Sequence, residues 1–170
     1  MADQYRKPYL ESSVFISWIK GEIVNGVDRK SIVEHVLNSA KNAAYYVFIS
    51  PVVLAEVHKR RGSPSLTDEE NGRILKFFEH EWIKMIDINR DDGEKANLLC
   101  RQYSLTPNDA LHLACALKGG CDILLSWDER LVSVVHPSIR IEQPQIITAG
   151  AAGAGGQFLL GDMLPRERIE

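Results

Sequence analysis

The feature that most constrains the fold is an alternation of short, mostly apolar runs with longer helix-forming segments. The apolar runs end at Leu10 or cover residues 45–49, 85–88, 123–125 and 139–141. Strands that are buried on both faces of a parallel sheet have this composition, because neither face carries a row of polar side chains. The alternation therefore predicts an α/β fold with a mainly parallel sheet.

Local signals place helices between these runs. Asp28 and Thr67 are expected N-caps, and Glu70 completes a capping box with Thr67. Ser50-Pro51 and Thr106-Pro107 each open a helix with proline in its first turn. Helices are expected over about residues 14–19, 28–40, 51–61, 67–78, 92–103, 107–118 and 128–134.

Length and composition indicate one domain followed by a tail. A chain of 170 residues that is 45% hydrophobic can bury a single core. Residues 1–148 are expected to form the domain, 149–156 a Gly/Ala-rich linker and 157–170 a tail. No run approaches the roughly 20 apolar residues of a membrane span. The 3 cysteines lack a C-x-x-C pair, which favours reduced thiols in a cytoplasmic protein.

The tail allows two interpretations. It is either a disordered extension or a segment whose apolar residues, from Phe158 to Leu164, dock on an apolar groove of this or another subunit. In the second case Arg166 or Arg168 would approach acidic side chains of the domain.

Four carboxylates follow the expected strands or lie on the helices that lead away from them. They are Glu11, Glu56, Asp109 and Asp128. In open α/β sheets the ligand site lies at the carboxyl ends of the strands. Like charges gathered there need a cation, and oxygen ligands suit Mg²⁺ or Mn²⁺. The cluster therefore predicts metal-assisted hydrolysis of a phosphodiester.

Each acid also has a purely structural interpretation. Asp109 could be the capping partner of Thr106, Asp128 the N-cap of its short helix, and Glu56 a solvated helix residue. His112 lies one turn after Asp109. It is interpreted as a half-buried packing residue, with contact to a substrate phosphate as the alternative.

Four segments resemble, in order, the motifs of the PIN-domain family. They are Leu-Glu-Ser-Ser-Val-Phe at residues 10–15, Ile-Ser-Pro-Val-Val-Leu-Ala-Glu-Val at 49–57, Leu-Thr-Pro-Asn-Asp-Ala-Leu-His-Leu-Ala at 105–114, and Gly-Cys-Asp-Ile-Leu-Leu-Ser-Trp-Asp at 120–128. The resemblance implies a three-layer α/β/α domain that cuts RNA with Mg²⁺ or Mn²⁺. Many bacterial and archaeal members are VapC-type toxins held inactive by an antitoxin, and a homodimer is a family-level expectation.

Carried over by position, the resemblance implies a catalytic and metal-binding role for Glu11, Glu56, Asp109 and Asp128. The family's small hydroxyl residue before the last acid falls on Ser126. Further substrate contacts are expected from Ser12, Lys59 and Arg60, although a basic run of this kind is also typical of a solvated helix end. Asp122 is expected to be structural, and the three tryptophans are expected in the core or at an interface.

Glu11 departs from the family pattern, in which the first acid is almost always aspartate. The additional methylene moves the carboxylate by about 1.5 Å, whereas metal sites tolerate a few tenths of an ångström. A retained but weaker site is therefore expected.

The resulting hypothesis is an endoribonuclease, as the toxin of a toxin–antitoxin pair. The alternative, favoured by Glu11 and by the net charge of −3, is an inactive PIN domain that serves as a binding or assembly module.

Overall fold

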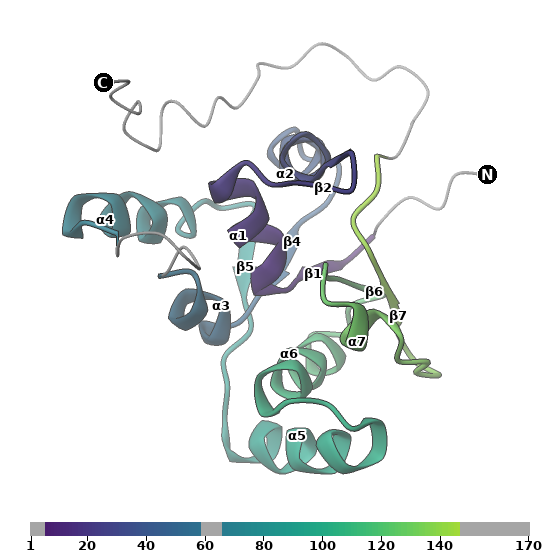
Figure 1. The fold of residues 1–170 in the computed structure, drawn as a ribbon. Coiled ribbons are helices and arrows are strands. Elements are labelled where there is room, and N and C mark those ends of the chain that lie inside the picture. Colours follow the sequence, from purple (N-terminus) through teal and green to yellow (C-terminus); the bar gives the residue numbers. More distant parts are fainter. Residues whose placement is uncertain (1–5, 59–65, 147–170) are drawn as a thin grey trace.

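The computed structural model describes residues 6–58 and 66–146. Its central feature is a five-stranded sheet in the order β5-β4-β1-β6-β7, in which each neighbouring pair is parallel (Figure 1). The strands are β1 (Pro8–Leu10), β4 (Val47–Ile49), β5 (Ile83–Met85), β6 (Ile123–Leu125) and β7 (Arg140–Glu142). The chain adds strands outward from β1 in one direction and then returns to β1's other side with β6. The change of direction at β1 is the kind of point at which α/β sheets bind ligands.

Helices cover both faces of the sheet (Figure 1). On one face lie α1 (Ser12–Lys20), α2 (Arg29–Lys41), α3 (Pro51–Glu56) and α4 (Asp68–Phe77). On the other lie α5 (Arg90–Tyr103), α6 (Pro107–Lys118) and α7 (Glu129–Val132). The prediction of a three-layer α/β/α fold with a mainly parallel sheet is confirmed.

Each central strand contributes to both hydrophobic cores. Leu10 packs with α1 and α2, whereas the preceding Tyr9 packs on the side of α5 and α6. In β6, Ile123 and Leu125 pack on the side of α1 and α2, and Leu124 packs on the side of α5 and α6. Successive strand side chains point to opposite faces. A strand with a helix layer on each face must therefore be apolar throughout, which is why these runs could be identified from the sequence.

The predicted N-caps of α2 and α4 are confirmed. The Asp28 carboxylate accepts a hydrogen bond from Ser31 N at 3.0 Å, and Thr67 and Glu70 form the expected capping box. Asp122 is structural as predicted, because its carboxylate accepts a hydrogen bond from the Lys7 backbone at 2.5 Å beside the start of β1.

Several predicted boundaries were wrong. Strand β5 begins at Ile83, two residues before the predicted strand, because Val47↔Ile83 and Ile49↔Met85 set its register against β4. Helix α3 ends at Glu56 rather than continuing to residue 61, and residues 57–58 form a turn. Helix α7 ends at Val132, and β7 is displaced by one residue from its prediction.

A two-stranded hairpin, β2 (Ile23–Val24) and β3 (Val27–Asp28), was not predicted. Its turn residues Asn25 and Gly26 both have positive φ, at 51° and 79°. An Asn-Gly pair is the preferred sequence of a type I′ turn, so the signal was present.

The cysteines of the described region are free thiols. Cys115 and Cys121 are buried, and burial raises the pKa of the Cys121 thiol to about 12. The prediction of reduced thiols agrees with this, and both side chains pack as small apolar groups in the core. Trp18 and Trp127 are also buried in the core. No helix between residues 6 and 58 or between 66 and 146 has the length and apolarity needed to cross a membrane. The linker and tail lie outside the described residues.

Candidate metal and active site

Glu11 follows β1 directly and caps α1. Its Oε2 accepts hydrogen bonds from Ser13 N at 3.1 Å, from the Ser126 hydroxyl at 2.8 Å and from the Ser13 hydroxyl. The side chain is 8% exposed. Because Ser126 follows β6, the neighbour of β1, the parallel register brings the two side chains together at the carboxyl end of the sheet. The carboxylate is therefore fixed by hydrogen bonds from two separate parts of the chain.

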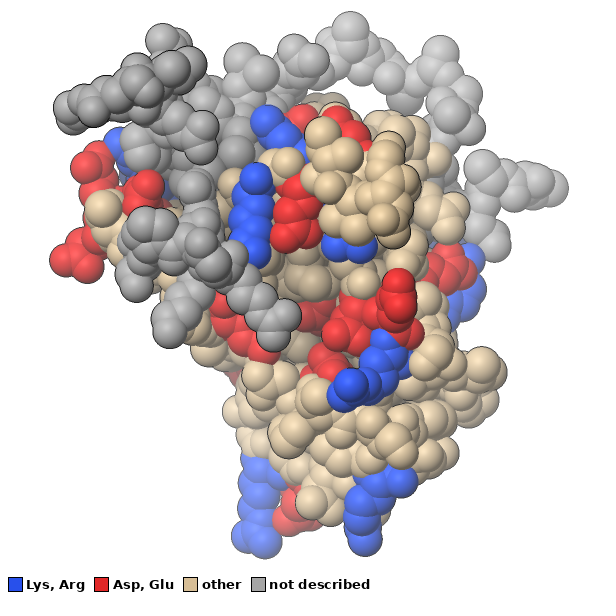
Figure 2. Space-filling model, in the orientation of Figure 1, with Lys and Arg blue, Asp and Glu red and all other residues tan. Residues whose placement is uncertain are grey.

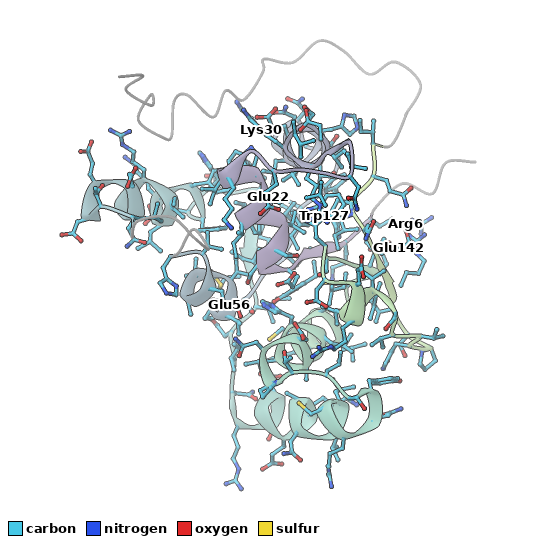
Figure 3. The ribbon with its side chains drawn as sticks, viewed as in Figure 1. Arg6, Glu22, Lys30, Glu56, Trp127 and Glu142 are labelled. Carbon is cyan, nitrogen blue, oxygen red and sulfur yellow. The ribbon has the colours of Figure 1, made fainter. Side chains whose placement is uncertain are left out.

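Glu56 is the last residue of α3 and reaches toward α6 (Figure 3). Its carboxylate accepts hydrogen bonds from the Ser12 hydroxyl at 2.5 Å, His112 Nε2 at 2.9 Å and the Asn108 amide at 2.5 Å. Burial alone would raise the pKa of Glu56, but the hydrogen bonds from His112, Ser12 and Asn108 outweigh it and lower the pKa to about 2. Glu56 is thus ionised at neutral pH.

His112 is a polar member of the site, so its interpretation as a half-buried packing residue was wrong. It is fully buried in α6, with Nε2 at 2.9 Å from Glu56 Oε2 and 3.2 Å from the Ser12 hydroxyl. Its Nδ1 lies 2.8 Å from the Tyr9 hydroxyl. The imidazole therefore connects the interior of the sheet to a carboxylate at its edge.

Glu11, Glu56 and His112 together form a group that could hold a cation. Each offers one ligand atom, and these atoms all lie within 4.8 Å of one another. Glu11 Oε1 is 3.8 Å from His112 Nε2. The two carboxylates suit a hard divalent ion. We call these three residues the inner cluster.

Asp109 and Asp128 lie outside the inner cluster, so the structure divides the four predicted acids into two pairs. Asp109, in the first turn of α6, accepts a hydrogen bond from the Thr106 hydroxyl at 2.5 Å. Asp128 caps α7, accepting from the Arg130 and Leu131 backbone amides at 2.9 and 3.1 Å. Asp128 thus has the N-cap role that the sequence allowed as an alternative, whereas Asp109 is bonded to the Thr106 side chain without the reciprocal bond to the Thr106 backbone that a capping box requires.

The predicted substrate-binding hydroxyls are bonded to the glutamates. Ser12 donates to Glu56, and Ser126 donates to Glu11 while accepting from the Asp128 backbone at 2.9 Å. Both serines are buried. Their contact with a substrate stays a prediction, as does that of Lys59 and Arg60, which lie outside the described residues.

Sequence reasoning missed several polar side chains around the inner cluster. They are Tyr9, Ser13, Ser50 and Asn108. One signal was available, since a tyrosine within an apolar strand needs a partner for its hydroxyl when it is buried. The identity of that partner depends on the packing of α6 and could not be read from the strand.

The surroundings of the site are mostly acidic on the face shown in Figure 2. Acidic side chains gather near the centre of this face, in the region where α1, α3, α6 and α7 converge in Figure 1, and Lys and Arg side chains lie on either side. A negative centre with positive flanks suits a cation at the centre and an extended polyanion across it.

Comparison with known proteins identifies the family. The PIN domain model matches residues 9–136, so this chain belongs to the PIN domain family. A search of curated proteins finds no match.

Solved structures with a similar fold include proteins of toxin–antitoxin systems. One is a chain of VapBC2 from Rickettsia felis bound to a DNA fragment from their promoter, with TM-score 0.57 and 21% identity, covering 81% of this chain and 98% of that one. A chain of a toxin–antitoxin complex from Klebsiella pneumoniae has TM-score 0.57 and 18% identity, covering 82% and 99%. Mycobacterium tuberculosis VapC20, a Sarcin-Ricin loop cleaving toxin, has TM-score 0.55 and 15% identity, covering 78% and 98%. At these identities the likeness concerns the fold.

Proposed function

We propose that this PIN domain is a metal-dependent endoribonuclease that hydrolyses RNA phosphodiester bonds. The observation that carries the proposal is the inner cluster, in which two hydrogen-bonded glutamates converge at the carboxyl edge of the sheet. VapC20, which shares the fold, is described as a toxin that cleaves the Sarcin-Ricin loop. The proposal extends RNA cleavage to this chain.

The donor atoms of the inner cluster fit Mg²⁺ or Mn²⁺. Glu11 and Glu56 would hold the ion. Asp109 and Asp128, which we call the rim aspartates, would complete the site from outside the inner cluster, where each is anchored at a helix N-terminus. A divalent ion in such a site supplies Lewis acidity toward a phosphate oxygen and activates water for attack.

The residues around the carboxylates would keep the site ready for an ion. Ser13 and Ser126 restrain the Glu11 carboxylate, and Ser12 and Asn108 restrain Glu56. Because the pKa of Glu56 lies well below neutral pH, its carboxylate is already ionised at pH 7, and an ion would not have to displace a proton from it. A preorganised, charged acceptor set is what binding of a hard cation requires.

The biological role we propose is that of the toxin of a toxin–antitoxin pair. Structures with this fold include a toxin–antitoxin complex and VapBC2. An antitoxin protein would then cover the acidic site, and a homodimer is proposed on the family resemblance.

Truncation at Gly150 tests whether the tail inhibits the site: an increase in nuclease activity would support inhibition, and unchanged activity and oligomeric state would exclude it.

The deciding experiment is cleavage of a generic RNA in the presence of Mn²⁺ by wild type and Asp109→Asn. Asparagine can still accept the Thr106 hydrogen bond but lacks the charge, so stability should be retained while kcat/KM falls about 100-fold, or about 2.7 kcal/mol in transition-state stabilisation. Asp91→Asn is a matched control, because Asp91 is an exposed acid in the first turn of α5. Wild-type protein without Mn²⁺-dependent cleavage would overturn the proposal in favour of an inactive binding module.

A further inference from the structure

We propose that His112 is a positioning residue of this site and not a metal ligand: its Nε2–H orients Glu56 toward the ion, and Tyr9 orients the imidazole. The inference rests on the proposed function, because it assigns His112 a task in the proposed metal site. It is carried by the hydrogen bonds of the imidazole and its neighbours, which require a donor at Nε2 and, in the neutral ring, an acceptor at Nδ1.

The contact with Glu56 determines which imidazole nitrogen carries hydrogen. An ionised carboxylate only accepts hydrogen bonds, so at 2.9 Å from Glu56 Oε2 the Nε2 of His112 must be the donor. A nitrogen that carries hydrogen has no lone pair to offer a metal. In the neutral ring, this leaves Nδ1 as an acceptor, and the Tyr9 hydroxyl at 2.8 Å supplies the hydrogen.

Tyr9 and Ser50 extend the arrangement into the sheet. The Tyr9 hydroxyl lies 2.7 Å from the Ser50 hydroxyl, which can donate to it while Tyr9 donates to His112. The rings of Tyr9 and His112 also make an edge-on contact, with centroids 5.8 Å apart and an interplanar angle of 64°. Tyr9, Ser50 and His112 are all fully buried. Without water as an alternative partner, breaking this chain leaves polar groups unsatisfied, so the ring orientation is strongly restrained.

The alternative is that His112 becomes the third ligand of the inner cluster. Its Nε2 lies 3.8 Å from Glu11 Oε1 and within the same group of potential ligand atoms. Ligation would require Nε2 to lose its hydrogen, Nδ1 to gain one and the hydrogen bond to Glu56 to break. The structure already satisfies both nitrogens without these changes, which favours the positioning role.

Two substitutions test the contacts of the two imidazole nitrogens separately. His112→Gln places an amide group near the position of Nε2 and can still donate to Glu56, whereas His112→Asn reaches only the position of Nδ1 and can contact Tyr9 alone. Removing the partner that orients a ligand typically weakens metal binding 10–100-fold. We expect that loss in Mn²⁺ affinity for His112→Asn, and a loss below about fivefold for His112→Gln. Calorimetric titration of the full chain with Mn²⁺ measures both, and thermal unfolding establishes that each variant is folded.

Spectroscopy of the wild type tests the same proposal without a mutation. In the metal-free protein, ¹⁵N NMR of the imidazole should report hydrogen on Nε2. In the Mn²⁺-loaded protein, electron spin-echo spectra should lack the coupling of a directly bound histidine nitrogen. A neutral ring protonated only on Nδ1, a directly bound nitrogen, or equal Mn²⁺ affinities for the two variants would each overturn the positioning role.

Failure of this inference differs from failure of the proposed function. If wild type and both variants bind Mn²⁺ equally and cleave RNA, His112 has no positioning role and the nuclease proposal stands. Wild-type protein that neither binds Mn²⁺ nor cleaves RNA would overturn the nuclease, and with it any task for His112 in metal binding.

Discussion

The inner glutamates and the rim aspartates lie at the same end of the sheet but are held in opposite ways. Glu11 and Glu56 are each fixed by donors from distant parts of the chain, including Ser126 and His112. Asp109 and Asp128 are each bonded within their own helix start. Rim side chains are therefore placed by local sequence and inner ones by tertiary packing. The two pairs should respond differently to mutation.

Among substitutions of the four acids, the largest effect on Mn²⁺ affinity is expected at Glu11. Glu11→Asp shortens the side chain and withdraws the carboxylate from Ser126, while aspartate remains a good N-cap for α1. We expect Mn²⁺ affinity to fall about tenfold, because the carboxylate then lacks the partner that orients it. Titration with Mn²⁺ measures this. Tighter binding by Glu11→Asp would instead show that glutamate weakens the site and that the hydrogen bonds found here do not compensate for its length.

A smaller effect, on stability, is expected at the rim. Asp128→Ala removes the acceptor for the Arg130 and Leu131 amides and should lower the free energy of unfolding by about 1 kcal/mol. Asp128→Asn keeps a capping acceptor and should stay close to wild type in urea unfolding. If the two variants are equally destabilised, charge rather than capping would be the stabilising property of Asp128.

A further effect is a pH dependence of stability that comes from Glu56. Hydrogen bonds hold the pKa of Glu56 at about 2, below its ordinary 4.5, although its burial acts in the opposite direction. A lowered folded-state pKa stabilises the protein above the unfolded value, and that stability is lost as the pH falls from about 4.5 toward 2. In Glu56→Gln this part of the acid-induced loss should be absent. Urea unfolding of both proteins at a series of pH values measures this. Equal losses of unfolding free energy in wild type and Glu56→Gln would show that Glu56 is not the source of the pH dependence.

The layered fold was predictable because its signals are local. Strand β6 is apolar because a helix layer covers each face, and helix α4 begins at a capping box formed by Thr67 and Glu70. Strand β5 was predicted two residues late because its position depends on pairing with β4, which apolar composition does not specify.

The site was predictable only in part. The sequence indicated the acidic residues and their common edge of the sheet, because parallel strands align their carboxyl ends. It also offered an N-cap role for Asp128, which the structure bears out, and a capping-box role for Asp109, whose carboxylate instead accepts from the Thr106 hydroxyl. It did not separate the glutamates from the aspartates, and it assigned His112 to packing.

By itself, the sequence determined the α/β architecture, most helix starts and the region where the carboxylates gather. These features follow from side-chain periodicity and from hydrogen bonds between residues close in the chain. Only the tertiary structure decided that Tyr9, His112 and Glu56 form one connected set, with contacts spanning 103 residues from Tyr9 to His112 and 56 from His112 to Glu56. Such contacts depend on how α6 and α3 lie against the sheet, and a buried polar atom takes whichever partner that packing brings within reach.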